Sequence, residues 1–591
     1  MRHRTLVVKL IAIFLAIFGS TLIVLAGLPY PGLRSVLDGL SPDGVFNSMK
    51  PWNAGVFRVL LAAGGIGFLA LAGLTFFQRW GRIGLWLQKL WTDSLHFFRL
   101  RRPQKNELGF LAALVLIMAL AVILRLERVQ WTMTHDEAYT FAAFGQSLFS
   151  ALSDYHLPNN HVFHSILVYF STHLFGIAPW AVRLPAFTAG VLLIPAVYWM
   201  AKRFHDRWTA LGAAFLAAWF RPLIDYSDSA RGYTLVALFT VLTIALADVV
   251  RREKNLFAWL LMVLFSALGL FTVPVMLFPF GILYVWLFLE NLSGDVVTGP
   301  GSYQNQGEFF SYWVVSGLVT AILTAFLYLP VLVYSGPQKL FSNIYVAPVA
   351  WSVLLETLST RFGETWAQWT FRMAIYMIWV LAAGWLVALI FHKRLSRVKV
   401  PLQLAALLWI TALILIQRPN AMSKVWVFLQ PLMLMWAAAG IFGFLQKIRP
   451  RFLGGRPLGA AAAVGVLLVA GSWQAVRLVP DLPEIWARKG EEEKTVLLIQ
   501  GQLQANELIA VAPTLDASIW YYSRLHGIPE AYFNSYTADY QRLIVLVYLP
   551  EGQTFDSVVQ NRGFHLRDLE TDSARLLATF ESIQVFEVER K

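Results

Sequence analysis

Two adjacent carboxylates, Asp136 and Glu137, follow His135 in the segment "WTMTHDEAYTF" (131–141), which lies between long apolar runs. A carboxylate can accept the proton of a hydroxyl group while that oxygen attacks a substrate, and partial burial would raise the carboxylate pKa toward a useful value. Since adjacent side chains rarely reach one atom, we expect Asp136 to act as the base and Glu137 to orient a neighbouring group or helix. A structural alternative is that the pair caps a helix starting near Ala138 and favours its dipole.

Cations and other polar residues near the ends of further apolar runs are candidates for the same site. The cations that would stabilise a phosphate group are Arg183, Arg231, Arg418 and Lys424. The substrate-binding candidates are His135, Asn160, His161, His164, Asp225 and Asp228. Arg183 and Lys424 could instead anchor the chain at a membrane interface, and Arg231 could form a structural ion pair with a nearby aspartate. A divalent metal is left open, with Asp136 and Asp228 as the ligands to consider.

The composition predicts a polytopic α-helical membrane protein. Of 591 residues, 57% are hydrophobic and only 14% are charged, against about a quarter in a soluble protein. Apolar runs of about 20 residues recur through the first 480 positions, and each is long enough to cross a bilayer. The first run has a basic start but no convincing cleavage site, so we expect it to be retained as a span. The absence of cysteine fits a bacterial envelope protein.

The basic residues fix an expected topology, because cytoplasmic loops collect lysine and arginine. Their short clusters between spans argue against nucleic acid as a partner. The expected spans are about 7–27, 54–78, 108–125, 181–201, 208–222, 231–250, 256–273, 275–290, 312–330, 370–392, 401–416, 424–445 and 457–479. These 13 helices place the acidic segment and the C-terminus outside, with 160–177 in the outer interface. The loop 291–309 is then inside although it holds no lysine or arginine, and the loop 335–368 is expected to carry an interfacial helix over the site.

The C-terminal part differs in composition from the rest of the chain. Residues 481–591 hold 17 acidic and 10 basic side chains, whereas the first 480 residues hold 18 acidic and 38 basic ones. Within it, "ELIAVAP" (507–513), "RLIVLVYLP" (542–550) and "SIQVFEVER" (582–590) are typical of strands, and helices are expected at 515–527 and 554–564. We expect three parts: two extra spans with a basic loop in 1–107, a transmembrane catalytic domain in 108–479, and an extracytoplasmic α/β domain in 480–591 that has a structural or acceptor-docking role.

The segments "THDEAYT", "NNHVFHSIL", "AVRLPAF" and "SDSARGYTL", in this order and spacing, resemble the GT-C superfamily of glycosyltransferases that use polyprenyl-phosphate sugars. The similarity is greatest to the branch of protein mannosyltransferases and aminoarabinose transferases, and it covers roughly 105–445. It implies that Asp136 is the base with Glu137 as its partner, that Arg183 binds near the donor phosphate, and that Arg231 and Tyr233 occupy a patterned position. Many relatives have His-Pro-Pro or Lys-Pro-Pro where this chain has His161 followed by valine and phenylalanine.

This resemblance implies a hexosyl- or pentosyltransferase of the bacterial cytoplasmic membrane. It would move a sugar from a polyprenyl-phosphate donor to a glycan, lipid or protein acceptor at the outer face, with no cofactor required beyond the metal left open above. A single base with a separate cationic patch suits a one-step inverting displacement, because a polyprenyl phosphate leaves without a general acid. The alternatives are a lipid or glycan flippase, which predicts charges near mid-span and internal repeats, and a non-catalytic envelope assembly protein.

Overall fold

The structure is a computed structural model. It describes the whole chain apart from 1, 41–53, 77–79, 101–106, 301, 342–346, 372, 448–464, 466–468, 470–471, 474, 488 and 534–539.

The apolar runs form helices, as their length and composition predict. The helices that overlap the first twelve expected spans are α1 (Arg2–Gly27), α3 (Ala54–Phe76), α5 (Leu108–Leu126), α9 (Pro179–Phe204), α10 (Arg207–Trp219), α12 (Tyr233–Arg252), α13 (Leu256–Thr272), α14 (Leu277–Leu292), α15 (Gln306–Leu327), α19 (Ile375–Ile390), α21 (Leu402–Gln417) and α22 (Leu429–Lys447). Six helices in the described part of the chain are long and apolar enough to cross a membrane, so the chain is a polytopic membrane protein. The expected number of 13 spans stays a prediction, and most of the last one, 457–479, lies outside the described residues.

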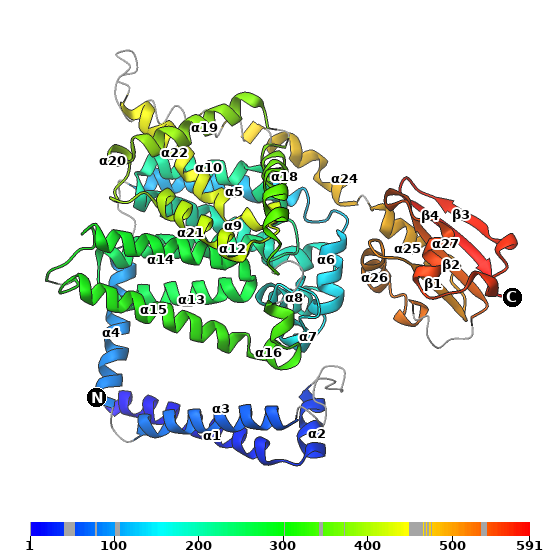
Figure 1. Cartoon of the computed structure of the whole chain (residues 1–591), viewed down its shortest axis with the longest axis horizontal. Coiled ribbons are helices and arrows are strands. Elements are labelled where there is room, and N and C mark those ends of the chain that lie inside the picture. Colours follow the sequence, from blue (N-terminus) through cyan, green and yellow to red (C-terminus); the bar gives the residue numbers. More distant parts are fainter. Residues whose placement is uncertain are drawn as a thin grey trace.

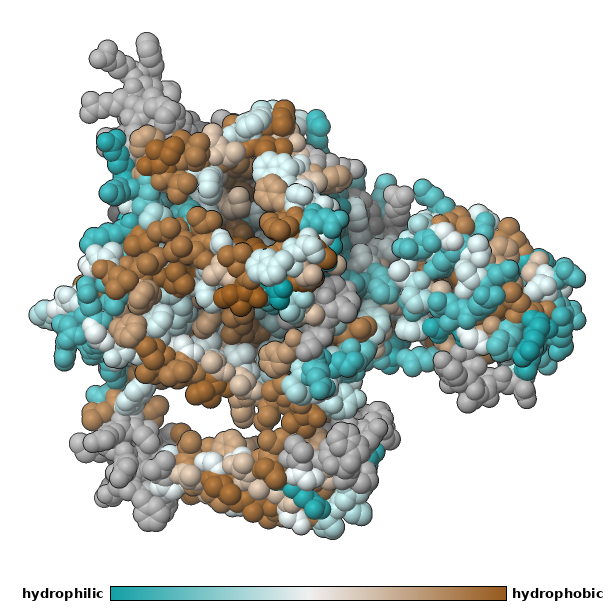
Figure 2. All heavy atoms as spheres, viewed as in Figure 1, coloured by the Kyte–Doolittle hydropathy of each residue, from teal (hydrophilic) through white to brown (hydrophobic). Residues whose placement is uncertain are grey.

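The long helices run from one end of a bundle to the other, and the hairpin of α1 and α3 lies beside this bundle, linked to it by α4 (Trp80–Leu100) (Figure 1). Hydrophobic side chains cover the sides of the bundle and the hairpin, whereas hydrophilic ones gather at the two ends and on the C-terminal domain (Figure 2). This distribution matches a bilayer that surrounds the helices and leaves both ends in water.

Basic side chains at the ends of α9 and α12 lie at the same end of the bundle. Arg203 and Arg251 both donate to the buried carboxylate of Asp248 at 2.7 Å, which joins the end of α9 to the end of α12. Arg251 also donates to the carbonyl oxygen of Asp295 at 2.9 Å, so the loop 291–309 lies at this end despite its lack of basic residues. The basic residues at the ends of α9 and α12 therefore share one end of the bundle. That this end faces the cytoplasm stays a prediction.

The acidic segment lies at the opposite end, among short helices (Figure 1). These are α6 (His135–Tyr139), the π-helical turn η2 (Thr140–Gly145), α7 (Leu148–Ser153), α8 (Val162–Phe175), α16 (Leu329–Tyr334) and α17 (Pro337–Phe341). The longer α18 (Trp351–Thr370) runs across the ends of the bundle helices, and its Arg361 donates to Asn420 at 2.8 Å. A helix is therefore present in the loop where the sequence predicts one.

The chain after α22 ends in a four-stranded sheet with the order β1-β2-β4-β3. Strand β1 (Glu507–Val511) pairs in parallel with β2 (Arg542–Tyr548), and β4 (Ile583–Glu589) pairs antiparallel with β2 and with β3 (Arg575–Thr579). The strands alternate their apolar side chains between two buried clusters. Helices α25 (Glu491–Gln502) and α26 (Asp516–Leu525) cover one face, and α27 (Phe555–Asn561) covers the other. Strand β3 is absent from the sequence-based prediction.

Helix α26 docks this domain onto the acidic segment. Met133 N donates to the hydroxyl oxygen of Tyr522 at 3.0 Å, and the Tyr521 hydroxyl donates to the carbonyl oxygen of Ile177 at 2.6 Å. The same apolar cluster contains residues of α6, α8 and α9 together with α25, α26 and the inner strand faces. The C-terminal domain is thus packed against the end of the bundle that carries Asp136.

Candidate active site

Glu137 holds the acidic segment in place. Thr134 N and Thr134 Oγ1 donate to Glu137 Oε2 at 3.0 and 2.9 Å, which fixes the first turn of α6. Ala230 N donates to Oε1 at 2.7 Å, and Arg183 donates to both carboxylate oxygens at 2.8 Å. Burial alone would raise the pKa of Glu137, but Arg183 and the hydrogen bonds outweigh it and hold that pKa below its ordinary value. The side chain is 1% exposed and its carboxylate contacts only protein groups, so its predicted role as an orienting partner fits better than direct catalysis.

The buried guanidinium group of Arg183 likewise makes its hydrogen bonds within the protein. Besides its two bonds to Glu137, it donates from Nη1 to the carbonyl oxygens of Arg128 and Trp131 at 3.1 and 2.6 Å, and from Nη2 to that of Thr132 at 3.0 Å. A buried charge must be paired and hydrogen-bonded, and these contacts satisfy the whole guanidinium group. Arg183 is thus paired with Glu137 and does not line the cavity described below, and its predicted contact with a donor phosphate stays a prediction.

Asp136 points the other way, into a cavity of about 770 Å³. Its Oδ2 lies 3.5 Å from Arg231 Nη1 and 3.5 Å from Lys424 Nζ, and half of the side chain is exposed. His135, then Arg231 and Lys424, hold the pKa of Asp136 below its ordinary value and outweigh the opposing effect of burial. The sequence-based expectation of a raised pKa is not met in this structure, because His135 and the cations favour the charged carboxylate.

The cations stand beside further polar groups at one end of the cavity. Arg231 donates to Asn159 Oδ1, and Asn159 Nδ2 in turn donates to the carbonyl oxygen of Asp136 at 3.1 Å. Gly232 N donates to His161 Nδ1 at 2.7 Å, and burial, followed by Arg231, lowers the pKa of His161 well below its ordinary value. The ring is therefore neutral with its proton on Nε2, 3.3 Å from Arg231 Nη2. Two neighbouring N–H donors in this position suit an anion.

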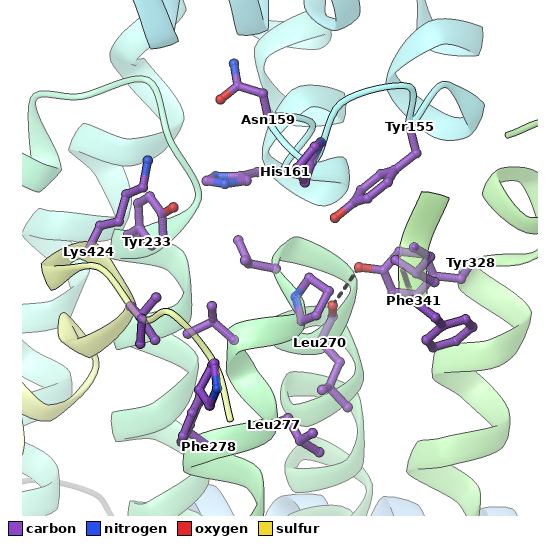
Figure 3. Close-up of a pocket in the computed structure, with 18 of the residues that line it drawn as sticks. Tyr155, Asn159, His161, Tyr233, Leu270, Leu277, Phe278, Tyr328, Phe341 and Lys424 are labelled. Carbon is purple, nitrogen blue, oxygen red and sulfur yellow. Dashed lines mark hydrogen bonds between the residues drawn. The ribbon is translucent and has the colours of Figure 1, made fainter. Parts of the chain in front are cut away.

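The rest of the cavity is apolar. In Figure 3, Lys424, Tyr233, Asn159, His161 and Tyr155 surround one end, and the labelled residues toward the other end are Leu270, Leu277, Phe278, Tyr328 and Phe341. Helices α13, α14 and α15 supply part of the apolar wall, in which α15 presents the small residues Ala321, Thr324 and Ala325. The cavity is amphipathic: its cationic end lies next to Asp136, and its apolar part extends among the bundle helices.

The cavity brings together Asp136, His135, His161, Arg231, Tyr233 and Lys424 from the predicted set. The other candidates lie elsewhere. Asn160 is buried and donates to the carbonyl oxygens of Ala151 and Asp154 at 3.0 and 2.7 Å, so it shapes the loop before α8. His164 is fully buried in α8, where neither ring nitrogen has a partner among the described residues.

Three charged candidates are also excluded from the cavity lining. Asp225 pairs with Arg128 and with Arg221, the latter at 2.9 Å. Asp228 is buried behind the site and does not line the cavity. Arg418 has a left-handed backbone (φ 47°) at the end of α21, and its guanidinium lies over the Trp351 ring, 5.4 Å from the centroid. None of these three residues lines the cavity, and their predicted substrate or phosphate contacts stay predictions.

Among the residues that the structure describes, no ligand set is present for the divalent metal that the sequence leaves open. Asp136 and Asp228 do not share a site, and within the described residues no three histidine or acidic side chains form a group that could hold an ion. Two cations already flank Asp136 Oδ2, which disfavours a divalent cation at that oxygen.

The C-terminal domain contributes Asp516, which sequence reasoning missed. Its Oδ1 lies 3.4 Å from His135 Nε2, while His135 Nδ1 lies 3.9 Å from Asp136 Oδ1. These two carboxylates, Asp136 first, raise the pKa of His135 to about 9. The only sequence signal was the acidic residue at the start of the helix expected at 515–527.

This contact predicts a pH-dependent stability. Because the folded pKa of His135, about 9, is above the ordinary 6.5, its stabilising effect is complete below pH 6.5 and is lost as the pH rises through 9. We expect the unfolding temperature of the detergent-solubilised protein to fall over this window, and to fall less in Asp516→Asn. The exposed Asp556→Asn is the matched control. An identical pH slope in all three proteins would show that the contact adds nothing.

Comparison with known proteins finds one family that matches part of the chain and several solved structures that are similar to it. Residues 161–303 match the family described as dolichyl-phosphate-mannose-protein mannosyltransferase. Among solved structures, ArnT from Cupriavidus metallidurans in the apo state is 12% identical and has a TM-score of 0.49, with 80% of this chain and 97% of that chain covered. Archaeal oligosaccharyltransferase AglB from Archaeoglobus fulgidus, in complex with an inhibitory peptide and a dolichol-phosphate, is 13% identical with a TM-score of 0.41, covering 78% of this chain and 64% of that one.

A comparison with curated proteins finds no match. The segment 161–303 contains His161, Arg231 and Tyr233 of the cavity wall. Over this segment the chain is similar to the dolichyl-phosphate-mannose-protein mannosyltransferases, and the resemblance to the polyprenyl-phosphate-dependent glycosyltransferases is confirmed there.

Proposed function

We propose that this protein is a membrane glycosyltransferase that moves a sugar from a polyprenyl-phosphate donor to an acceptor hydroxyl, with Asp136 as the base. The observation that carries the proposal is the amphipathic cavity: one end presents Arg231 and Lys424 to Asp136, and the other extends between apolar helices. The family match of the segment 161–303 supports a lipid-phosphate donor.

The shape of the cavity fits such a donor. An isoprenoid chain would lie against α13, α14 and α15, where its burial is favourable, and its phosphate would reach the cations at the polar end. Arg231 can offer two N–H groups to phosphate oxygens, Lys424 adds a second charge, and His161 adds a neutral donor. The sugar would then stand beside Asp136.

Binding of the donor would itself prepare the base. In the structure His135, Arg231 and Lys424 stabilise the charged form of Asp136. A phosphate that pairs with these cations removes this stabilisation and adds negative charge nearby, so the pKa of Asp136 rises toward the range where it can hold a proton. The acceptor oxygen then bonds to the anomeric carbon as the bond to the phosphate oxygen breaks, and its proton passes to Asp136. The cations stabilise the departing phosphate, and the single displacement inverts the anomeric centre.

We also propose that the site and the C-terminal domain lie outside a bacterial cytoplasmic membrane. They occupy the end of the bundle opposite the clusters around Asp248, and such clusters mark the cytoplasmic side. A reporter fused after Lys591 checks this, with activity expected only for reporters that work outside the cell.

The function is tested by incubating the purified protein with a panel of polyprenyl-phosphate sugars and a membrane extract as acceptor. We expect release of polyprenyl phosphate from at least one donor. A flippase would move lipid between the leaflets of a vesicle without releasing polyprenyl phosphate, and an assembly protein would do neither.

The cationic end gives a separate binding prediction. Arg231→Gln and Lys424→Gln each remove a charged partner of the phosphate, so each should weaken binding of undecaprenyl phosphate by about tenfold or more. Lys399→Gln, which changes an exposed lysine at the other end of the bundle, should leave binding unchanged. Equal affinities in all three variants would place the lipid phosphate elsewhere.

A further inference from the structure

A second hollow lies between the acidic segment and the C-terminal domain. This crevice, of about 560 Å³, is bounded on one side by α6 and η2 and on the other by α26 and the turn η6 (Glu530–Phe533). We propose that the crevice binds the saccharide part of a glycan acceptor. The inference rests on the proposed function and names the class of acceptor for the same site.

Aromatic rings form much of the wall. Tyr139, Trp520 and Phe533 line the crevice and are partly exposed, whereas Phe141 and Tyr521 are buried and pack against each other at its edge. The C–H faces of pyranose rings are apolar and pack on such rings, while sugar hydroxyls require polar partners around the edge. An aromatic wall with scattered polar groups is therefore the lining that a carbohydrate needs.

Two polar groups in the wall have no partner among the described residues. Ser523 is 2% exposed, yet its Oγ makes no hydrogen bond, and the indole Nε1 of Trp520 is buried and also unpaired. Buried polar groups nearly always have a partner, because leaving one unsatisfied costs about 1–3 kcal/mol. A hydroxyl of a bound sugar can accept a hydrogen bond from the indole N–H, and it can donate to or accept from the serine hydroxyl.

The charges of the crevice cancel. Arg524 donates to Glu530 Oε1 at 2.7 Å and also to the side-chain oxygen of Gln146. The arginine is thus already neutralised by a carboxylate, which leaves little attraction for an anion. These contacts favour an uncharged polyhydroxyl ligand over a phosphate or a carboxylate.

The crevice borders the catalytic cavity. Tyr139 lines both hollows, and it lies three residues after Asp136, one helical turn along α6. Its hydroxyl lies 2.8 Å from His156 Nε2, and His156 is part of the crevice wall. A glycan bound here would therefore have its end beside the base.

A peptide acceptor fits these walls less well. Extended peptides commonly add to an exposed sheet edge, where backbone groups supply hydrogen bonds. The walls are instead formed by side chains of α26, η2 and η6, and η6 packs against the outer strand β1.

The test is saturation-transfer NMR on the full chain in detergent, with chitotetraose, mannotetraose, maltotetraose and a serine- and threonine-rich peptide as probes. We expect at least one tetrasaccharide to bind. Trp520→Leu should weaken that binding about tenfold, as expected for loss of one stacking surface. Ser523→Ala should weaken it in the same direction, and it provides a second test if the tryptophan variant does not fold. Phe555→Leu, on the opposite face of the sheet, is the matched control and should bind like the wild type.

Undecaprenyl phosphate is titrated into the same samples to separate this inference from the proposed function. Binding of the lipid without binding of any tetrasaccharide, binding of the peptide alone, or saccharide affinities unchanged in both crevice variants would overturn the crevice assignment and leave the proposed function standing. Failure of the wild type to bind undecaprenyl phosphate would contradict the proposed function instead.

Discussion

Replacing Asp136 with asparagine is expected to lower the rate of sugar transfer by about 10²–10⁴-fold while leaving donor binding intact or tighter. Asparagine cannot take the acceptor proton, which accounts for the loss of rate. The same change removes the carboxylate that now occupies Arg231 and Lys424, 3.5 Å from each, so the phosphate no longer competes for them. Single-turnover release of polyprenyl phosphate and equilibrium binding of undecaprenyl phosphate measure the two effects separately.

The opposite signs of these two effects make the prediction specific. If Asp136 only shaped the segment, its loss would weaken both binding and transfer. Asn159→Ala serves as the comparison, because it removes a neighbour of Arg231 but no base. A transfer rate in Asp136→Asn equal to that of the wild type would rule out its role as the base.

Replacing Glu137 with glutamine is expected to destabilise the protein by about 3–5 kcal/mol. The reason is that Arg183, 2% exposed, would keep its charge without the carboxylate that it contacts through two nitrogen atoms at 2.8 Å. Thermal unfolding in detergent measures the change. Glu364→Gln breaks the more exposed ion pair with Arg361 and should alter stability by less than about 1 kcal/mol.

The same variant separates positioning from catalysis. Glu137 accepts a hydrogen bond from Ala230 N, next to Arg231, so its loss should also lower the transfer rate through a displaced cation. The pH dependence of the remaining turnover should match that of the wild type, because Glu137 is not the titrating base. A shifted pH profile with normal stability would instead assign proton transfer to Glu137.

The transmembrane helices could be predicted because an apolar run that is long enough to cross a bilayer must form a helix there. Runs such as those of α5 and α12 can satisfy their backbone groups in a bilayer only as helices, so composition was sufficient. The charge pattern also predicted that the basic residues at the ends of α9 and α12 lie at one end of the bundle. The loop 291–309 lies at the same end, where the carbonyl oxygen of Asp295 accepts a hydrogen bond from Arg251. Strand β3 was missed because it is half exposed at the sheet edge and lacks a clear alternation.

The site was predictable in its chemistry but not in all its partners. Consecutive helix residues point about 100° apart, so only one of Asp136 and Glu137 could face the cavity. Which cation would pair with the other carboxylate depended on the packing of α6 against α9, and this assigned Arg183 to Glu137. The turn after α21 likewise directs Lys424 into the cavity and Arg418 toward Trp351. No local pattern connects Asp516 to His135, because the contact is made across the docked domain.

The most direct test of the account is an experimental structure of the full chain with undecaprenyl phosphate bound. We predict density for the phosphate between Arg231 and Lys424, beside Asp136, with the isoprenoid chain along α13, α14 and α15. Density for the phosphate at Arg418 or outside the cavity, with Arg231 and Lys424 still paired to Asp136, would contradict the proposed donor site.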